Sequence, residues 1–382
     1  MTGTEDTIKD TLLKFLNDGG KFISSSSVIS SDLTHDGVDE YIISVEYYVQ
    51  PEDISSTGNI FILGCTNGRY RNLLTIRTLY EEPPEVIKII DMNLDGVLEI
   101  VFGELSCHYC SSIWVYEWNG YEFQSLIKSG TDFGMRDVAT IIGLGKVEIF
   151  DTDGNGTLEI RLTTLRSGFG DEVLMGPWRS EIYTYMWDGE YFSLYSLDYS
   201  APEYRFQAVQ DGDRESLKRD YKDALIYYNE AITSSSLRSW SKDIQYQIWT
   251  QDTAEKMGTQ TPTMLPPNQM EYNQLVAYAY YRIMVNYSLQ REDQKAIKIL
   301  NLLKTKYPIT NPGYPYTEIA MEYWSEFQNN NDIGKSCTKV IEYASKHPEI
   351  LSPISGPESS FWNRQYKPAD MCPFRGSDGS LL

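Results

Sequence analysis

One stretch decides the fold of this chain: Asp91-Met92-Asn93-Leu94-Asp95-Gly96-Val97-Leu98-Glu99, followed at once by the apolar run Ile100-Val101-Phe102. It places oxygen-bearing side chains at positions 1, 3, 5 and 9 and a glycine at position 6. The same spacing recurs from Asp32 to Glu40 and from Asp151 to Glu159, so the three starts lie 59 and then 60 residues apart. Such regular recurrence indicates three structural repeats.

The recurring pattern has the chemistry of a calcium loop. Ca²⁺ takes six to eight oxygen ligands in flexible geometry, which the alternating acidic and amide side chains of a short curled loop can supply. Glycine at position 6 permits the sharp reversal that brings the last carboxylate back, and position 7 adds a backbone carbonyl. We therefore expect up to three Ca²⁺ ions. The predicted ligands are Asp32, Thr34, Asp36, Glu40 and the Val38 carbonyl; Asp91, Asn93, Asp95, Glu99 and the Val97 carbonyl; and Asp151, Asp153, Asn155, Glu159 and the Thr157 carbonyl.

A plainer interpretation is that the Asp-Gly and Asn-Gly pairs in these stretches only make hairpin turns. Three copies that agree at positions 1, 3, 5, 6 and 9 favour metal binding over this alternative. An EF-hand is not indicated. Its last carboxylate stands at position 12 and a helix follows it, whereas here an apolar β run follows position 9.

The loops resemble those of FG-GAP and VCBS-type repeats of integrin-like β-propellers, in which Asp-x-Asn-x-Asp-Gly-x-x-Asp/Glu precedes a strand. The resemblance covers residues 26–198 and implies one four-stranded blade per repeat, with calcium in the loop joining its first two strands. Thr34 departs from the usual Asp or Asn, and Asn155 departs from the usual Asp. A propeller needs at least four blades to close, so three blades form an open arc or are completed by a partner.

Each repeat reads as β runs around the loop, followed by a hairpin. In the second repeat, residues 86–90 enter the loop and residues 99–103 leave it. Hairpin turns are expected at Asn67-Gly68, Asn119-Gly120 and Asp188-Gly189, where both central residues would have positive φ.

From about residue 203 the apolar periodicity becomes helical and indicates three helix pairs. Small residues where the helices cross, and a proline after the second helix, resemble tetratricopeptide (TPR) repeats over about 205–348. The resemblance implies stacked helix pairs with a concave face that binds peptides. A helical bracket for the β repeats, without a ligand, is the alternative.

The chain is thus expected to be a multidomain β + α protein. We divide it into an N-terminal helix and linker (1–25), three β repeats with calcium loops (26–200), a TPR-like helical domain (201–350), and an aromatic C-terminal segment with a tail (351–382). A length of 382 residues is enough for several cores, and a hydrophobic content of 41% argues for a folded chain rather than a disordered one.

The five cysteines are Cys65, Cys107, Cys110, Cys337 and Cys372. The single Cys107-x-x-Cys110 pair lacks the second pair of ligands that a zinc site needs. Disulfides fit an exported protein better. Cys337 with Cys372 would staple the C-terminal segment to the helices, and Cys65 with Cys107 or Cys110 would join neighbouring repeats. The connectivity stays open at this point.

Charge and hydropathy restrict the partners. A net charge of −21 disfavours nucleic acids and anionic membrane surfaces. No apolar run reaches the length of a membrane span, so we expect no membrane insertion. The sequence shows no signal peptide, and we expect one to have been removed from a chain that works outside the cell or at its surface.

Catalytic motifs do not stand out. The three histidines are scattered, and there is no nucleophile elbow, zinc-protease motif or phosphate-binding glycine loop. We therefore expect a non-catalytic, calcium-stabilised extracellular scaffold that binds a protein or peptide. Two alternatives stay open. One is a polysaccharide-directed enzyme with its site in a cleft between the β repeats and the helices, and the other is a structural subunit of a surface assembly, a homo-oligomer paired through β edges.

Overall fold

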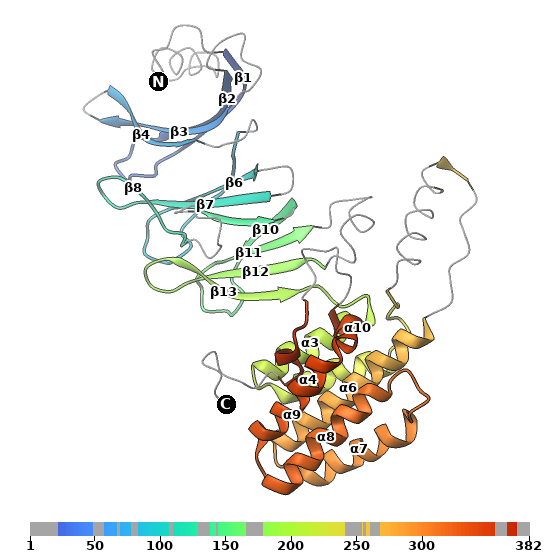
Figure 1. Cartoon of the computed structure of the whole chain (residues 1–382). Coiled ribbons are helices and arrows are strands. Elements are labelled where there is room, and N and C mark those ends of the chain that lie inside the picture. Colours follow the sequence, from blue (N-terminus) through green and yellow to red (C-terminus); the bar gives the residue numbers. More distant parts are fainter. Residues whose placement is uncertain are drawn as a thin grey trace. The chain divides into compact units, whose positions relative to one another are not determined.

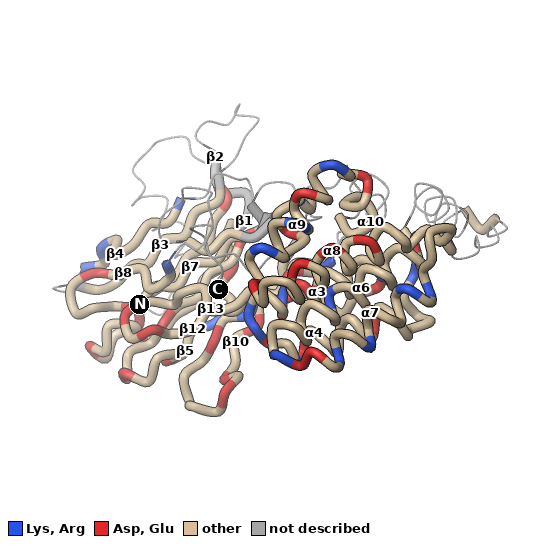
Figure 2. Tube along the Cα trace, turned by 60° about the horizontal axis from the view of Figure 1, so that its bottom comes forward, with Lys and Arg blue, Asp and Glu red and all other residues tan. Residues whose placement is uncertain are grey.

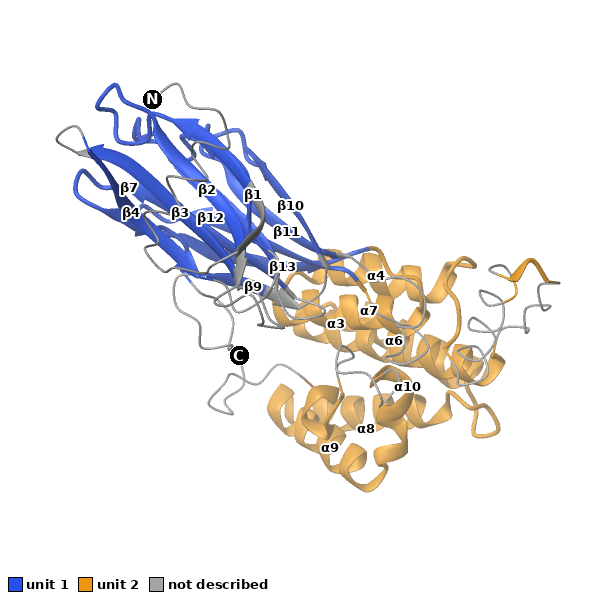
Figure 3. Ribbon diagram, turned by 90° about the horizontal axis from the view of Figure 1, so that it is seen from above, with its two compact units in different colours: residues 1–167, 180–200 blue, residues 168–179, 201–382 orange. Residues whose placement is uncertain are grey.

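The computed structural model describes residues 22–48, 57–66, 69–77, 83–106, 110–128, 138–142, 144–165, 179–240, 254, 257–259, 268–355 and 365–372. The chain divides into two compact units, residues 1–167 with 180–200 and residues 168–179 with 201–382 (Figure 3). Strands make up the first unit and helices the second, so the predicted β + α organisation is confirmed (Figure 1). The expected N-terminal helix lies outside the described residues.

The described part of the first unit forms three antiparallel sheets, each built from strands consecutive in the sequence. The first sheet consists of β1 (Phe22–Ser31), β2 (Glu40–Tyr48), β3 (Thr57–Thr66) and β4 (Arg69–Arg77). The second consists of β5 (Glu85–Ile90), β6 (Glu99–Ser106), β7 (Cys110–Trp118) and β8 (Phe123–Ser125), with β9 (Ala139–Ile142) also paired to β7. The third consists of β10 (Leu144–Phe150), β11 (Glu159–Leu165), β12 (Glu181–Trp187) and β13 (Phe192–Tyr199). Among the described strands, no sheet closes on itself.

The three sheets are joined through two apolar layers. The layer between the first and second sheets includes Leu33, Ile42, Ile62, Ile100, Phe102 and Trp114. The layer between the second and third sheets includes Met92, Val101, Val115, Ile160, Leu162 and Tyr185. Because successive side chains of a strand face opposite sides, β6 contributes to both layers. Among the described residues, the middle sheet therefore contributes to both layers.

The hairpin turns differ from the expected form. Gly120 and Gly189 have φ of 90° and 101°, but the residues before them, Asn119 and Asp188, do not have positive φ. Instead, the Oδ1 atom of each of these residues accepts the N–H groups two and three residues further on, at 2.8–3.0 Å. The prediction of two positive φ values is wrong at both turns, because the polar side chain stabilises the turn from its first position. The turn predicted at Asn67-Gly68 lies outside the described ranges.

The described residues of the second unit form three helix hairpins with similar turns. They are α3 (Arg205–Leu217) with α4 (Tyr221–Thr233), α6 (Gln269–Leu289) with α7 (Asp293–Lys306), and α8 (Tyr314–Asn330) with α9 (Ile333–Lys346). The short helices η1 (Pro348–Leu351), α10 (Ser352–Ser355) and η2 (Pro368–Met371) follow. Each hairpin turns through one residue of positive φ, namely Arg219, Arg291 or Asn331. The helix pairs predicted from periodicity are thus present.

A buried ion pair lies in the core of the second unit. Asp213 of α3 is 2% exposed and Arg282 of α6 is 0% exposed, and Arg282 Nε lies 2.7 Å from Asp213 Oδ1. The same carboxylate accepts hydrogen bonds of 2.6–2.7 Å from the hydroxyls of Tyr228, Tyr278 and Tyr366. Burial is the largest influence and lowers the pKa of Arg282, but Asp213 and the neighbouring tyrosines together outweigh it and hold that pKa well above its ordinary value. One carboxylate therefore connects α3, α4, α6 and the C-terminal segment.

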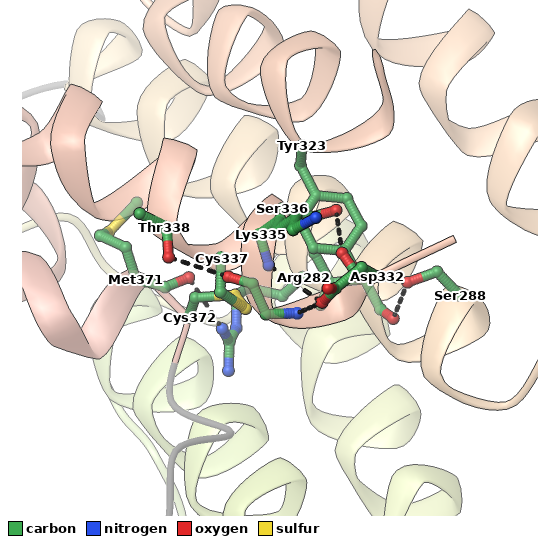
Figure 4. The surroundings of a disulfide bond; sticks show 12 residues. Arg282, Ser288, Tyr323, Asp332, Lys335, Ser336, Cys337, Thr338, Met371 and Cys372 are labelled. Carbon is green, nitrogen blue, oxygen red and sulfur yellow. Dashed lines mark hydrogen bonds between the residues drawn. A yellow bond between two sulfur atoms is a disulfide. The ribbon is translucent and has the colours of Figure 1, made fainter. Parts of the chain in front are cut away.

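A disulfide joins Cys337 of α9 to Cys372, with their Cα atoms 5.3 Å apart (Figure 4). This is the pairing proposed for the C-terminal segment from the sequence. The neighbouring Met371 carbonyl accepts Arg282 Nη1–H at 3.2 Å, so the disulfide and the ion pair fix the same segment. Cys65 is half-buried and forms no disulfide with a described residue. Its proposed partners, Cys107 and the side chain of Cys110, lie outside the described part of the chain.

We predict that Asp213→Asn destabilises the second unit by about 3–5 kcal/mol, because it removes the carboxylate that neutralises the buried Arg282. Glu322→Gln, which removes an exposed charge from α8, should change the free energy of unfolding by less than about 0.5 kcal/mol. Urea unfolding followed by the helical circular dichroism signal measures both. Equal effects of the two substitutions would contradict the role given to the ion pair.

Candidate metal centre

The three predicted loops each join the first two strands of one sheet. We call residues 32–40 loop 1, residues 91–99 loop 2 and residues 151–159 loop 3. Positions 4 and 6 of every loop have positive φ, which falls on His35 and Gly37, Leu94 and Gly96, and Gly154 and Gly156. The three loops therefore share one backbone turn, as their common spacing predicts.

Hydrogen bonds inside the loops repeat as well. The carboxylate at position 1 accepts the N–H of position 6 at 3.0–3.1 Å. The side chain at position 5 accepts the N–H of position 7, which is Val38, Val97 or Thr157, at 2.7–2.8 Å. The glutamate at position 9 accepts the N–H of position 2 at 2.6–2.8 Å. These bonds draw positions 1, 5 and 9 into one curled segment.

Loop 2 gathers three carboxylates, one of which is buried. Asp91, Asp95 and Glu99 each offer an oxygen within 4.8 Å of the others. Glu99 begins β6 and is 0% exposed, and its Oε2 accepts the Met92 N–H at 2.6 Å. Its Oε1 has no hydrogen-bond partner among the described residues. Asn93, the remaining predicted ligand, accepts the Asp95 N–H through Oδ1 at 2.9 Å. A buried, unpartnered carboxylate oxygen beside two other carboxylates is a place that a cation can neutralise.

Loop 3 repeats this arrangement. Asp151, Asp153 and Glu159 bring carboxylate oxygens within 4.8 Å of one another. Glu159 is 1% exposed, its Oε2 accepts both the N–H and the hydroxyl of Thr152 at 2.6 Å, and its Oε1 has no partner in the described part of the chain. Asn155 accepts the Thr157 N–H at 2.7 Å and so takes the place that Asp95 has in loop 2. Two loops therefore present the same unsatisfied oxygen.

Loop 1 differs, and Thr34 is the reason. Its hydroxyl donates to Glu40 Oε1 at 3.2 Å, while Glu40 Oε2 accepts the N–H groups of Leu33 and Thr34. Both oxygens of the buried glutamate are thus satisfied within the loop. Asp32, Asp36 and Glu40 do not bring three carboxylate oxygens within 4.8 Å of one another. The structure gathers the predicted acidic ligands in loops 2 and 3 and not in loop 1.

Glu117 was not among the predicted ligands, yet it lies at loop 2. It stands in β7 directly opposite Glu99, is 7% exposed, and accepts a hydrogen bond from Asn93 Nδ2 through Oε2 at 3.1 Å. Burial, and next the Asp95 carboxylate, raise the pKa of Glu117. Burial also raises the pKa of Glu99 to about 8, with Glu117 adding to the increase. The only sign of Glu117 in the sequence is that an acidic residue interrupts the apolar strand segment 113–118.

The second and third sheets also line a hollow of about 230 Å³. Glu85, Glu104 and Ser111 are among its lining residues, together with apolar side chains such as Ile113 and Val147. Binding sites for small molecules usually measure about 300–1,000 Å³. The hollow is therefore smaller than most such sites.

Compared with models of known protein families the chain matches none, and no curated protein matches it. The likeness to FG-GAP/VCBS blades and to TPR repeats thus stays an interpretation of the residues. Acidic residues, red in Figure 2, occur along the loops of the first unit and on the helices of the second. Within the described ranges, no helix has both the length and the apolarity to cross a membrane.

We predict that, with calcium chelated, the first unit loses stability as the pH rises. The folded pKa of Glu99, about 8, lies above its ordinary value of 4.5, so its contribution is complete below pH 4.5 and is lost as the pH passes 8. Glu99→Gln keeps an oxygen acceptor for the Met92 N–H but cannot ionise, so it should remove the loss of stability at high pH. Thermal unfolding in chelator at about pH 5 and about pH 8.5 measures the effect. The exposed Glu122→Gln should behave as wild type, and an unchanged pH response in Glu99→Gln would contradict the assignment.

Proposed function

We propose that the first unit is an open stack of propeller-like blades of the FG-GAP/VCBS type, stabilised by Ca²⁺ in loops 2 and 3 and more weakly in loop 1. The observation that carries this proposal is the pair of buried glutamates, Glu99 and Glu159, each with an unpartnered Oε1 beside two further carboxylates. An ionised carboxylate buried without a partner is costly, and a cation offsets that cost. A set of oxygen ligands in a flexible loop suits Ca²⁺ better than transition metals that prefer nitrogen or sulfur.

Calcium in loop 2 would act on the packing of the sheets as well as on the loop. Met92, whose N–H donates to Glu99, is 0% exposed and belongs to the layer between the second and third sheets. Its carbonyl accepts the N–H of Leu158 in loop 3 at 2.8 Å. A cation that fixes Glu99 would therefore also fix the residue at which two loops and two sheets meet.

For the whole chain we infer a non-catalytic extracellular scaffold whose TPR-like helical unit binds a protein or peptide. Three consecutive helix hairpins, each with one left-handed residue in its turn, support a repeat array. The Cys337–Cys372 disulfide fits an oxidising compartment. Calcium loops of extracellular modules, with dissociation constants of about 10⁻⁴ to 10⁻³ M, are filled outside cells.

Calcium at about 10 mM should raise the free energy of unfolding of the first unit by about 1.4–2.7 kcal/mol for each filled loop, if the dissociation constants are about 10⁻³ to 10⁻⁴ M. Glu99→Gln and Glu159→Gln should each remove one bound ion and its share of this stabilisation. Glu40→Gln should have a smaller effect, because Thr34 already satisfies Glu40. Thermal unfolding in calcium and in chelator measures stability, and equilibrium dialysis counts the ions.

The control for this experiment is Glu122→Gln, an exposed carboxylate on the turn after β7 that contributes to none of the loops. It should keep the wild-type ion count and the wild-type response to calcium. A wild-type chain that binds no calcium would reduce the loops to turns and would remove the support for calcium-binding blades.

The scaffold proposal predicts sequence-selective peptide binding by the second unit. The full chain, immobilised and screened against a displayed random peptide library, should enrich peptides that share a motif. Binding should persist in Glu99→Gln, whose change lies in the first unit, and should weaken in Asp213→Asn, which loosens the helical core. A screen without enrichment would favour the helical unit as a bracket for the β repeats.

A further inference from the structure

The register of the second sheet brings another carboxylate to loop 2. Glu117 of β7 pairs directly with Glu99 of β6. Strand alternation places both on the face shared with Val101 and Val115, which belong to the layer between the second and third sheets. Like charges directly opposite each other in an antiparallel pair are destabilising. Two buried glutamates held together in this way, one with an unpartnered oxygen, are an arrangement that a cation relieves.

Glu117 also fixes the orientation of a predicted ligand. Asn93 Nδ2 donates to Glu117 Oε2 at 3.1 Å and to Asp95 Oδ2 at 3.3 Å. Because the amide nitrogen is held by these two carboxylates, the carbonyl end is directed to the loop, where Oδ1 accepts the Asp95 N–H at 2.9 Å. A carbonyl oxygen has two lone pairs, so Oδ1 retains one for a cation.

The other two loops have no equivalent of Glu117. Gly64 lies across from Glu40, since a Cβ on this glycine would stand 3.2 Å from Glu40 Cγ. The register of β11 and β12 places Met186 across from Glu159. Neither residue carries a charge. In loop 3 the third position is Asp153, whose carboxylate has no N–H to donate across the strands.

We propose that Glu117 supports the cation site of loop 2, where it orients Asn93 and adds a negative charge beside the group of Asp91, Asp95 and Glu99, and that loop 2 is the tightest of the three sites. This inference rests on the calcium binding proposed above. The affinity of an oxygen site for Ca²⁺ depends on the charge of its ligands and on how rigidly they are held. Loop 2 therefore fills before loop 3, and loop 1 fills last because Thr34 satisfies its glutamate.

Calorimetric titration of the full chain with calcium tests the order of filling. Glu117→Gln keeps an oxygen acceptor for Asn93 Nδ2 and removes only the charge. We expect it to weaken the tightest binding step roughly tenfold, since ligand charge tunes calcium affinity. The same step should be absent in Glu99→Gln, present in Glu159→Gln and unchanged in the control Glu122→Gln.

Stability without calcium distinguishes a residue of the site from one that only supports the fold. In chelator, Glu117→Gln should unfold at a higher temperature than wild type, because it removes a buried carboxylate that lies opposite Glu99. Adding calcium should raise the unfolding temperature of Glu117→Gln by less than it raises that of wild type.

The inference would be overturned if the tightest binding step had the same affinity in Glu117→Gln and wild type. It would also be overturned if that step were lost in Glu159→Gln instead of Glu99→Gln. A third contradicting result is a Glu117→Gln variant that binds calcium normally but unfolds at a lower temperature than wild type in chelator. A wild-type chain without calcium uptake would overturn the proposed function together with this inference. If wild type binds calcium and Glu117→Gln binds it equally well, only the inference about Glu117 fails and the proposed function stands.

Discussion

The ninth residue of loops 2 and 3 imposes the constraint on which the first unit depends. Glu99 and Glu159 are also the first residues of β6 and β11, so strand pairing fixes their positions and burial hides their side chains. The loop satisfies one oxygen of each and leaves the other without a partner among the described residues. Burying a charge in this way costs several kcal/mol unless a proton or a cation neutralises it. The same cost of burial raises the pKa of Glu99. The carboxylate oxygens of Asp91 and Asp95 lie close enough to Glu99 to share a cation with it.

The second unit buries a carboxylate by a different means. Asp213 has the Arg282 guanidinium as its counter-charge and three tyrosine hydroxyls as donors, so the chain supplies every partner itself. The disulfide at Cys372 fixes the segment that Arg282 contacts through the Met371 carbonyl. Under the calcium-binding proposal, the first unit would draw stability from an external ion, whereas the second unit has an internal ion pair and a covalent bond. Calcium and reductant should therefore act on different units.

Features encoded over short distances could be predicted from the sequence. Positions 1 and 6 of each loop bond to each other, so their spacing alone indicated the turn, and helical periodicity indicated the helix hairpins. Glu117 could not be predicted, because it follows Glu99 by 18 residues and meets it only through the register of β6 and β7. Thr34 departs from the usual Asp or Asn in the sequence, but only the structure shows that its hydroxyl donates to Glu40. The prediction of positive φ at Asn119 was wrong because its side chain accepts a hydrogen bond from the Tyr121 N–H, so Asn119 is the first residue of the turn rather than a central one.

The position of loop 2 gives a physical reason why the site proposed to be strongest would lie in the middle sheet. The middle sheet contributes side chains to both apolar layers, whereas the first and third sheets each contribute to one of these two layers. An ion that orders the start of β6 therefore acts on the strand shared by both layers. Through the bond from Leu158 to the Met92 carbonyl, it also acts on the neighbouring loop. The same binding energy placed in loop 1 would support only one layer, and there Thr34 already satisfies the glutamate without a cation.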